Sequence, residues 1–266
     1  MKLRNFLVKI FILLLVSSGC VLAQSYSPDK FSTAFNDYLV NRLVKIDFEV
    51  LNADKFSEKY KLTEFFLNSQ PQNIYGFIGH QLERIKVKID NAEQSKISAA
   101  KYILTGKTNV NNSIADFTGD LKLTDIYEFK EPITKHGLII CKFDAVLKET
   151  GTTPHIGVFR GNYYLILSKV VDDVRFPKAI PQFIKSHTFA GYWQSNDTKM
   201  NLSVMWGENY MLEELEDFLH GITGLLPIDE KIIEKSWKTY LDAYSEDTPK
   251  DLKQKAIEAE NSEWWK

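Results

Sequence analysis

Histidines and closely spaced acidic residues are the side chains of this sequence that could do metal or acid-base chemistry. The five histidines are scattered along the chain, at His80, His136, His155, His187 and His220. A metal site would have to be assembled from distant strands, for example from His136 and His155 with a carboxylate. Scattered histidines are more often hydrogen-bonded or surface residues. We therefore predict no metal site and no cofactor.

A pair of carboxylates at Asp172-Asp173, next to Arg175, could serve the acid-base chemistry of glycosidases. Adjacent residues on a strand point to opposite faces, so a solvated turn is the favoured interpretation. The sequence contains no Gly-rich phosphate loop, Gly-x-Ser-x-Gly, His-Glu-x-x-His, Cys-x-x-Cys or calcium-loop pattern. No catalytic residue is predicted, and a protein without enzymatic activity is favoured.

Aromatic residues are the remaining candidates for a site. Tyr163, Trp193 and Trp206 belong to segments with strand periodicity, and His187 ends the long connection that begins at Asp172. These four residues are predicted to contact a small apolar or mixed ligand. The same aromatic side chains could instead fill a closed interior. The sequence leaves open whether that interior is open or packed.

Tyr163, Trp193 and Trp206 lie in segments whose apolar residues recur with period two. The pattern Phe-x-Gly-x-bulky apolar occurs at Phe117-Gly119-Leu121, Phe159-Gly161-Tyr163 and Phe189-Gly191-Trp193. Residues i, i+2 and i+4 of a strand share one face. A recurring glycine between large side chains is a device for coiling a sheet sharply. The pattern therefore predicts a sheet that curls around an aromatic inner face.

The expected fold class is α+β, an antiparallel, strongly curled β-meander or barrel of about 7–8 strands with N-terminal and C-terminal helices. Short connections such as Asn111-Asn112 and Thr150-Gly151-Thr152 favour hairpins over parallel crossovers. Asp90-Asn91 is predicted to begin another turn. Four ranges follow: a signal peptide (1–23), an N-terminal helical segment (24–80), the barrel-like core (81–207) and a C-terminal helical segment (208–266).

Gly191-Tyr192-Trp193 resembles the Gly-x-Trp motif of lipocalin-type barrels. The resemblance covers three residues. In that family the motif opens the first strand, whereas here it lies near the end of the β region. It implies a barrel, and no site residue is carried over from it.

The flanking segments show helical spacing. Ser27-Pro28 is a suitable helix start, residues 55–68 have a helical pattern, and Pro249 precedes a charged helix that ends before Trp264 and Trp265. Residues 43–51 fit either a helix or a strand. The terminal tryptophans are expected to dock on the barrel, because the charges of the last helix are mixed in sign.

The first 23 residues have the pattern of a signal peptide, with a basic start, a short apolar stretch and an Ala-x-Ala-like site before Gln24. A second processing route is lipidation of Cys20, because Ser17-Ser18-Gly19-Cys20 resembles a bacterial lipobox. Either route predicts an exported protein, periplasmic or extracellular, whose membrane contact would come only from the lipid. After cleavage no intramolecular disulfide framework is expected, and Cys141 is predicted to be a buried thiol on a strand.

The formal net charge of −2 becomes −5 when Lys2, Arg4 and Lys9 are removed with the leader. Without a clustered basic face, nucleic-acid binding is not expected. The sequence predicts an exported ligand-binding or interaction module, whose partner is a small apolar or mixed ligand or another envelope protein. Two alternatives remain: a hydrolase acting on envelope or extracellular polymers, and a structural, partner-binding envelope protein.

Overall fold

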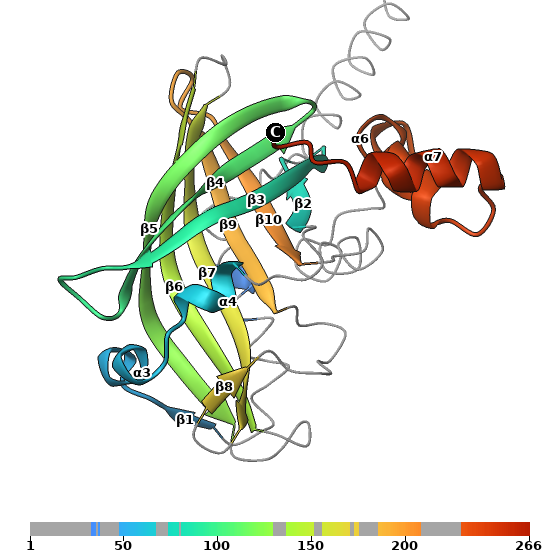
Figure 1. Ribbon diagram of the computed structural model, residues 1–266. Helices are drawn as coiled ribbons and strands as arrows, with labels where there is room; N and C mark the ends of the chain where they lie inside the picture. Colours follow the sequence, from blue (N-terminus) through green and yellow to red (C-terminus); the bar gives the residue numbers. More distant parts are fainter. Residues whose placement is uncertain are drawn as a thin grey trace, which may run out of the picture.

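The computed structural model describes residues 33–35, 37, 48–67, 74–79, 81–129, 137–151, 156–170, 173–175, 186–208 and 230–266. Within them, eight antiparallel strands form a closed barrel, and two further strands and several helices are attached to it (Figure 1). The predicted α+β curled barrel is confirmed.

The barrel is an up-and-down meander in which each strand pairs with the next one along the chain, and the last strand closes on the first. The eight strands of the ring are β2 (Ile74–Ile78), β3 (Glu83–Gln94), β4 (Lys101–Val110), β5 (Ser113–Phe129), β6 (Gly137–Thr150), β7 (Gly157–Val170), β9 (His187–Ser195) and β10 (Asn201–Glu208). β1 (Phe48–Val50) pairs with β5, and β8 (Asp173–Arg175) pairs with β7.

The two ends of the barrel differ. At one end, which we call the hairpin end, short connections join β2 to β3, β4 to β5, β6 to β7 and β9 to β10. The β4–β5 turn contains Asn111 and Asn112 with φ of 50° and 66°, as their tolerance of positive φ predicted. We call the opposite end, where β4 and β9 begin, the mouth. The mouth is at the bottom of the view in Figure 1, and the lower half of that view also contains α3, α4, β1 and β8.

Glycines on the inner face let neighbouring backbones approach closely. A Cβ atom added to Gly119 would lie 2.0 Å from the carbonyl oxygen of Val146 on β6. Gly161 and Gly191 are register partners on β7 and β9, and a Cβ on Gly161 would lie 2.6 Å from the Cα of Gly191. All three glycines lie within strands of the curled sheet, where the repeated pattern predicted them.

Two short helices precede the ring. α3 (Ala53–Lys59) begins after Asn52, whose side chain accepts a hydrogen bond from the amide of Lys55 at 2.9 Å. α4 (Thr63–Leu67) follows after a break at Tyr60. The predicted helical segment 55–68 is therefore two helices. The helix predicted after Ser27-Pro28 lies largely outside the described residues, of which 33–35 and 37 are helical.

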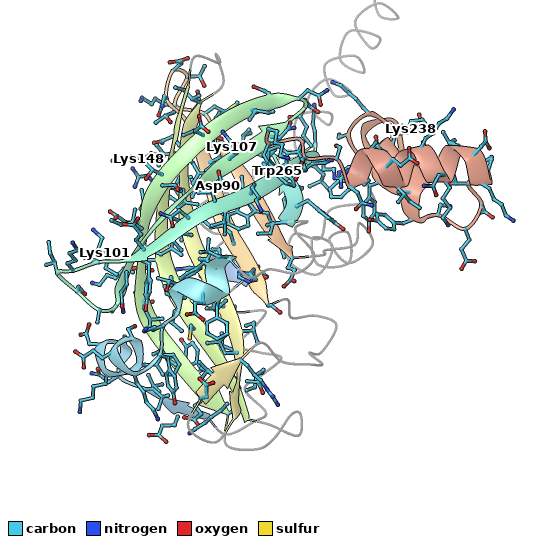
Figure 2. The ribbon with its side chains drawn as sticks, viewed as in Figure 1. Asp90, Lys101, Lys107, Lys148, Lys238 and Trp265 are labelled. Carbon is cyan, nitrogen blue, oxygen red and sulfur yellow. The ribbon has the colours of Figure 1, made fainter. Side chains whose placement is uncertain are left out.

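The C-terminal helices α6 (Glu230–Tyr244) and α7 (Lys250–Glu260) form a hairpin outside the barrel next to β2 and β3 (Figure 1). The chain then returns to the barrel, where Lys88 lies 5.0 Å from the ring centroid of Trp265. The outer strand surface carries charges of both signs, as Asp90, Lys101, Lys107 and Lys148 illustrate (Figure 2). No helix in the described ranges is long and apolar enough to span a membrane.

The structure differs from the sequence prediction at two places. The strand β2 lies in the range 24–80, which we predicted to be a helical segment. Within residues 43–51, which fitted either a helix or a strand, the described residues 48–50 form the strand β1. All five residues of β2 are buried, so the alternation that marks a half-buried strand is missing there. Asp90-Asn91 is not a turn, because β3 continues to Gln94 with a register shift between Ile89 and Asn91.

The close approach at Gly119 predicts a large cost for adding a methyl group there. Gly119→Ala should destabilise the protein by about 3 kcal/mol, the upper range for overpacking, because the methyl group meets backbone that cannot rotate away. Gly137→Ala is the matched control, since its Cβ would have no neighbour closer than 3.8 Å. Urea unfolding of both variants checks this. Equal stability of the two would contradict the packing described for β5 and β6.

Candidate functional site

A cluster of buried aromatic rings fills the mouth half of the barrel interior. Tyr163 of β7 is at its centre, with ring centroids 5.7 Å from Trp206 of β10 and 6.2 Å from Phe143 of β6. Trp206 stacks on Phe189 of β9 at 5.0 Å. We call this set the mouth cluster, and its members are Phe66, Tyr102, Phe143, Tyr163, His187, Phe189 and Trp206. Strand alternation places these β residues on the inner face.

The mouth cluster contains one buried polar pair. The hydroxyl of Tyr163 and Nδ1 of His187 are joined by a hydrogen bond of 2.6 Å, and both residues are fully buried. Burial lowers the pKa of His187 to about 3. Burial, with a smaller contribution from the negative charge of Glu208, raises the pKa of Tyr163 well above its ordinary value. At neutral pH the pair is therefore an uncharged imidazole and an uncharged phenol.

One ring of the mouth cluster comes from outside the barrel wall. Phe66 of α4 is fully buried, and its ring centroid lies 5.5 Å from those of Tyr102 and Phe143 and 5.6 Å from that of Tyr163. The preceding helix α3 is fastened by Gln94 of β3, whose side-chain amide donates to the carbonyl oxygen of Ser57 at 3.0 Å. Phe66 thus packs on three inner rings of the barrel from a helix that is not part of the sheet.

The hairpin end of the interior contains a buried carboxylate. Glu149 of β6 accepts hydrogen bonds from the Thr108 hydroxyl at 2.5 Å, the Gly157 amide at 3.0 Å and the Trp193 indole N–H at 2.7 Å. Burial raises the pKa of Glu149, although these three hydrogen bonds act in the opposite direction. The three donors occupy both carboxylate oxygens, so we assign Glu149 to the internal packing of the hairpin end.

The buried thiol of Cys141 has no features of a nucleophile. Cys141 is on the inner face of β6, as predicted, and burial raises its pKa above the ordinary range for a thiol. Among the described residues no group of three histidine, cysteine, aspartate or glutamate side chains could hold a metal ion.

The structure brings together three of the four predicted contact residues. Tyr163, His187 and Trp206 belong to the mouth cluster. Trp193 is on the inner face as well, but it lies toward the hairpin end and binds Glu149. Asp173 of the proposed carboxylate pair is exposed on β8, where its side chain accepts from the amide of Val174 at 2.8 Å. Asp172 and the histidines other than His187 lie outside the described residues.

Two buried side chains of the barrel interior were not identified from the sequence. Phe66 was predicted only as part of a helical apolar pattern. Glu149 is two residues after Leu147 on β6, so strand alternation places it on the same, inward face. That alternation could have identified Glu149 as an inward-facing residue. A charged residue at an inward position indicates either a strand end or a buried polar contact.

No family model, curated protein or solved structure matches the chain.

The hydrogen bonds of Glu149 predict different outcomes for two substitutions. Glu149→Gln retains an acceptor for Trp193 and Gly157 and can donate its amide to Thr108. Because the folded-state pKa is raised, the stability contribution of Glu149 is present below its unfolded pKa and lost as pH rises through the folded pKa. Glu149→Gln should therefore gain stability relative to the wild type from pH 4 to pH 8.

Glu149→Ala leaves three buried donors without an acceptor and should cost about 3 kcal/mol or more. Asp120→Asn, at an exposed ion pair with Lys101, is the control and should change stability by less than about 1 kcal/mol. Thermal unfolding across this pH range measures all three. If the wild type instead gained stability relative to Glu149→Gln as the pH rises to 8, the raised pKa of Glu149 and its role in internal packing would be contradicted.

Proposed function

We propose that the protein is an exported, non-enzymatic module that binds a small, largely apolar ligand in the mouth of its barrel. The observation that carries the proposal is the Tyr163–His187 pair, a polar contact enclosed by aromatic rings. Small-molecule sites are typically apolar concavities with a few placed polar groups. The export component rests on the leader-like sequence of residues 1–23.

The chemistry of the mouth cluster supports binding without catalysis. A general base that works near neutral pH needs a pKa near the operating pH, whereas burial lowers the pKa of His187 to about 3. The Tyr163 phenol is not ionised at neutral pH either, because burial raises its pKa. An uncharged hydrogen-bonding pair suits recognition of a hydroxyl, amide or carbonyl group on an otherwise apolar molecule.

The short length of α4 is consistent with a ligand replacing the Phe66 side chain in the mouth cluster. A helix of five residues is not stable in isolation, so α4 depends on the burial of Phe66. Burying a phenylalanine side chain stabilises by about 1.5–3 kcal/mol. A conformation with Phe66 withdrawn is therefore accessible at a cost that ligand binding can offset. A flat apolar group would then occupy the space between Tyr102, Phe143 and Tyr163.

Thermal melting of the mature chain with a panel of lipids, porphyrins and sugars tests the proposal. A ligand that binds only the native state raises the unfolding midpoint. We expect an apolar member of the panel to raise it, and Phe66→Ala to bind that member more tightly because the competing side chain is gone. Phe66→Ala should destabilise the unliganded protein by about 3–5 kcal/mol.

Leu67→Ala is the matched control, because Leu67 is on the same helix and 42% exposed. It should alter neither stability nor affinity appreciably. Tyr163→Phe retains the ring and removes the hydroxyl, and it should weaken a ligand that carries a polar group by about tenfold. If no member of the panel shifts the midpoint of either the wild type or Phe66→Ala, the mouth cluster is internal packing and the proposal fails.

A further inference from the structure

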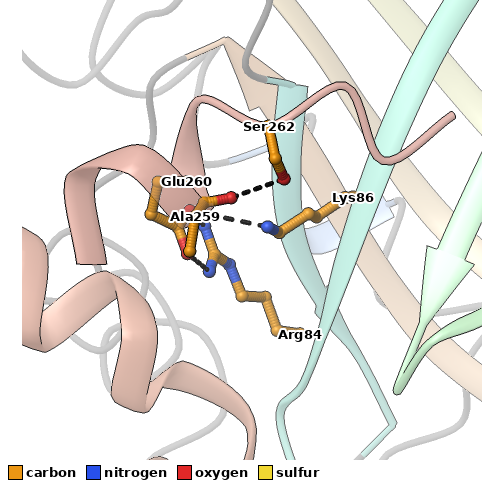
Figure 3. A network of polar contacts seen from close by, with 5 residues as sticks. All are labelled: Arg84, Lys86, Ala259, Glu260 and Ser262. Atoms are coloured by element: carbon orange, nitrogen blue, oxygen red, sulfur yellow. Dashed lines mark hydrogen bonds and ion pairs between the residues drawn. The ribbon is translucent and has the colours of Figure 1, made fainter. Parts of the chain in front are cut away.

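The C-terminal hairpin is attached to the outer face of the barrel by a buried ion pair. Arg84 of β3 donates two hydrogen bonds to the carboxylate of Glu260 at the end of α7, at 2.7 and 2.6 Å (Figure 3). The two side chains are only 5% and 4% exposed. Lys86, also on β3, lies 3.6 Å from the same carboxylate. A bidentate arginine–carboxylate contact of this kind fixes geometry as well as charge.

Aromatic rings from both the barrel and the hairpin enclose Arg84. Its guanidinium carbon lies 4.9 Å from the ring centroid of Tyr75 on β2, and 5.1 and 5.2 Å from those of Trp237 and Tyr240 on α6. The indole N–H of Trp237 donates to the carbonyl oxygen of Leu82, in the turn between β2 and β3, at 2.9 Å. The hairpin therefore holds β2, β3 and their turn together.

The charges of this contact favour the docked state at neutral pH. Burial alone would raise the pKa of Glu260, but the hydrogen bonds and charges of Arg84 and Lys86 outweigh it and hold that pKa below its ordinary value. Removing the Glu260 charge would leave Arg84 buried without its counter-ion, which is strongly unfavourable. The Glu260 carboxylate is therefore the counter-ion that makes burial of Arg84 under the docked hairpin favourable.

The strand that the hairpin covers forms the seam of the barrel. β2 has five residues and is the shortest strand of the ring. It pairs with β10 over the five positions from Val204 to Glu208, whereas β5 and β6 pair from Asp116 to Glu128. The β2–β10 pairing also joins the two strands of the ring that are farthest apart in sequence. β2 also pairs with β3 over only five positions, but the turn between these two strands and the hairpin contacts on Arg84 and Leu82 hold β2 to β3. The ring can therefore open on the β10 side of β2 with little loss of strand pairing.

We propose that the C-terminal hairpin is a clasp on the barrel: docking of Glu260 on Arg84 keeps β2 paired with β10, and release of the hairpin opens the barrel at that seam. Tyr75 links the hairpin to the seam. Its outward side chain packs on Trp237 and Tyr240, and its backbone belongs to β2, the strand that pairs with β10. Opening would expose the inward residues of β2 and the adjoining Trp206 of the mouth cluster. The clasp does not depend on whether the barrel binds a ligand.

Hydrogen exchange of the full mature chain, followed by mass spectrometry, tests the clasp. Glu260→Gln removes the charge at nearly constant shape, and Glu260→Lys places a third cation beside Arg84 and Lys86. In both variants we expect exchange to rise by about tenfold or more in peptides 74–78 and 204–208, in line with loss of a buried ion pair. Exchange in β5 and β6 should stay within about twofold of the wild type.

Lys238→Ala is the control, because it removes an exposed ion pair with Asp242 within α6. It should leave exchange at the seam unchanged. The clasp is overturned if the hairpin exchanges faster while the seam remains protected, if exchange rises equally in every strand, or if neither Glu260 variant alters exchange in the hairpin itself.

Discussion

The close approach of neighbouring strand backbones at the inner-face glycines is the constraint on which this structure depends. Gly161 and Gly191 face each other across β7 and β9, and neither could carry a methyl group without meeting the other strand. Coiling at these points narrows the ring. A narrow ring has room for one layer of large side chains, and the flanking residues Phe159, Tyr163, Phe189 and Trp193 supply it.

Two polar groups among the described residues of the interior are hydrogen-bonded to other interior residues. At the mouth the Tyr163–His187 pair is neutral, and at the hairpin end Glu149 is surrounded by three donors. A buried polar group without a partner would be costly, so each pair also fixes the arrangement of the rings around it. The mouth differs in one respect, since one of its rings comes from the short helix α4. That difference is why the proposed ligand site is placed at the mouth.

The helix α6, outside the barrel, packs on β2, the shortest strand of the ring. β2 has buried residues on both faces because its inner side faces the core and its outer side lies under α6. Tyr75, Arg84 and Trp237 form one packed unit across β2, β3 and the hairpin. The pairing of the first and last strands of the ring closes the longest stretch of chain, which carries a loop-closure entropy cost, and the contacts of the hairpin with β2 and β3 help to offset that cost.

Period-two alternation was sufficient to predict seven of the strands, and the glycine pattern predicted their coiling. It failed at β2, because a strand buried on both faces shows no alternation, and at Asp90-Asn91, because a bulge in a long strand has the composition of a turn. In the candidate site, alternation correctly placed Tyr163 and Trp206 on strands, whereas His187 was assigned to the connection before β9 and is in fact the first residue of that strand. It could not show that Trp193 pairs with Glu149, or that Arg84 is buried by a helix from the far end of the chain. Those contacts depend on tertiary packing.

The pairing of β2 with β10 is the contact that makes the sheet a closed barrel, and NMR tests it directly. Cross-strand nuclear Overhauser effects should join Trp206 to Gly76 and Val204 to Ile78, as the antiparallel register requires. Their presence, together with the corresponding signals between β5 and β6, would confirm closure around the aromatic interior. Their absence while every other strand pair shows its own signals would mean that the sheet is open, and this account of the barrel and its mouth would be contradicted.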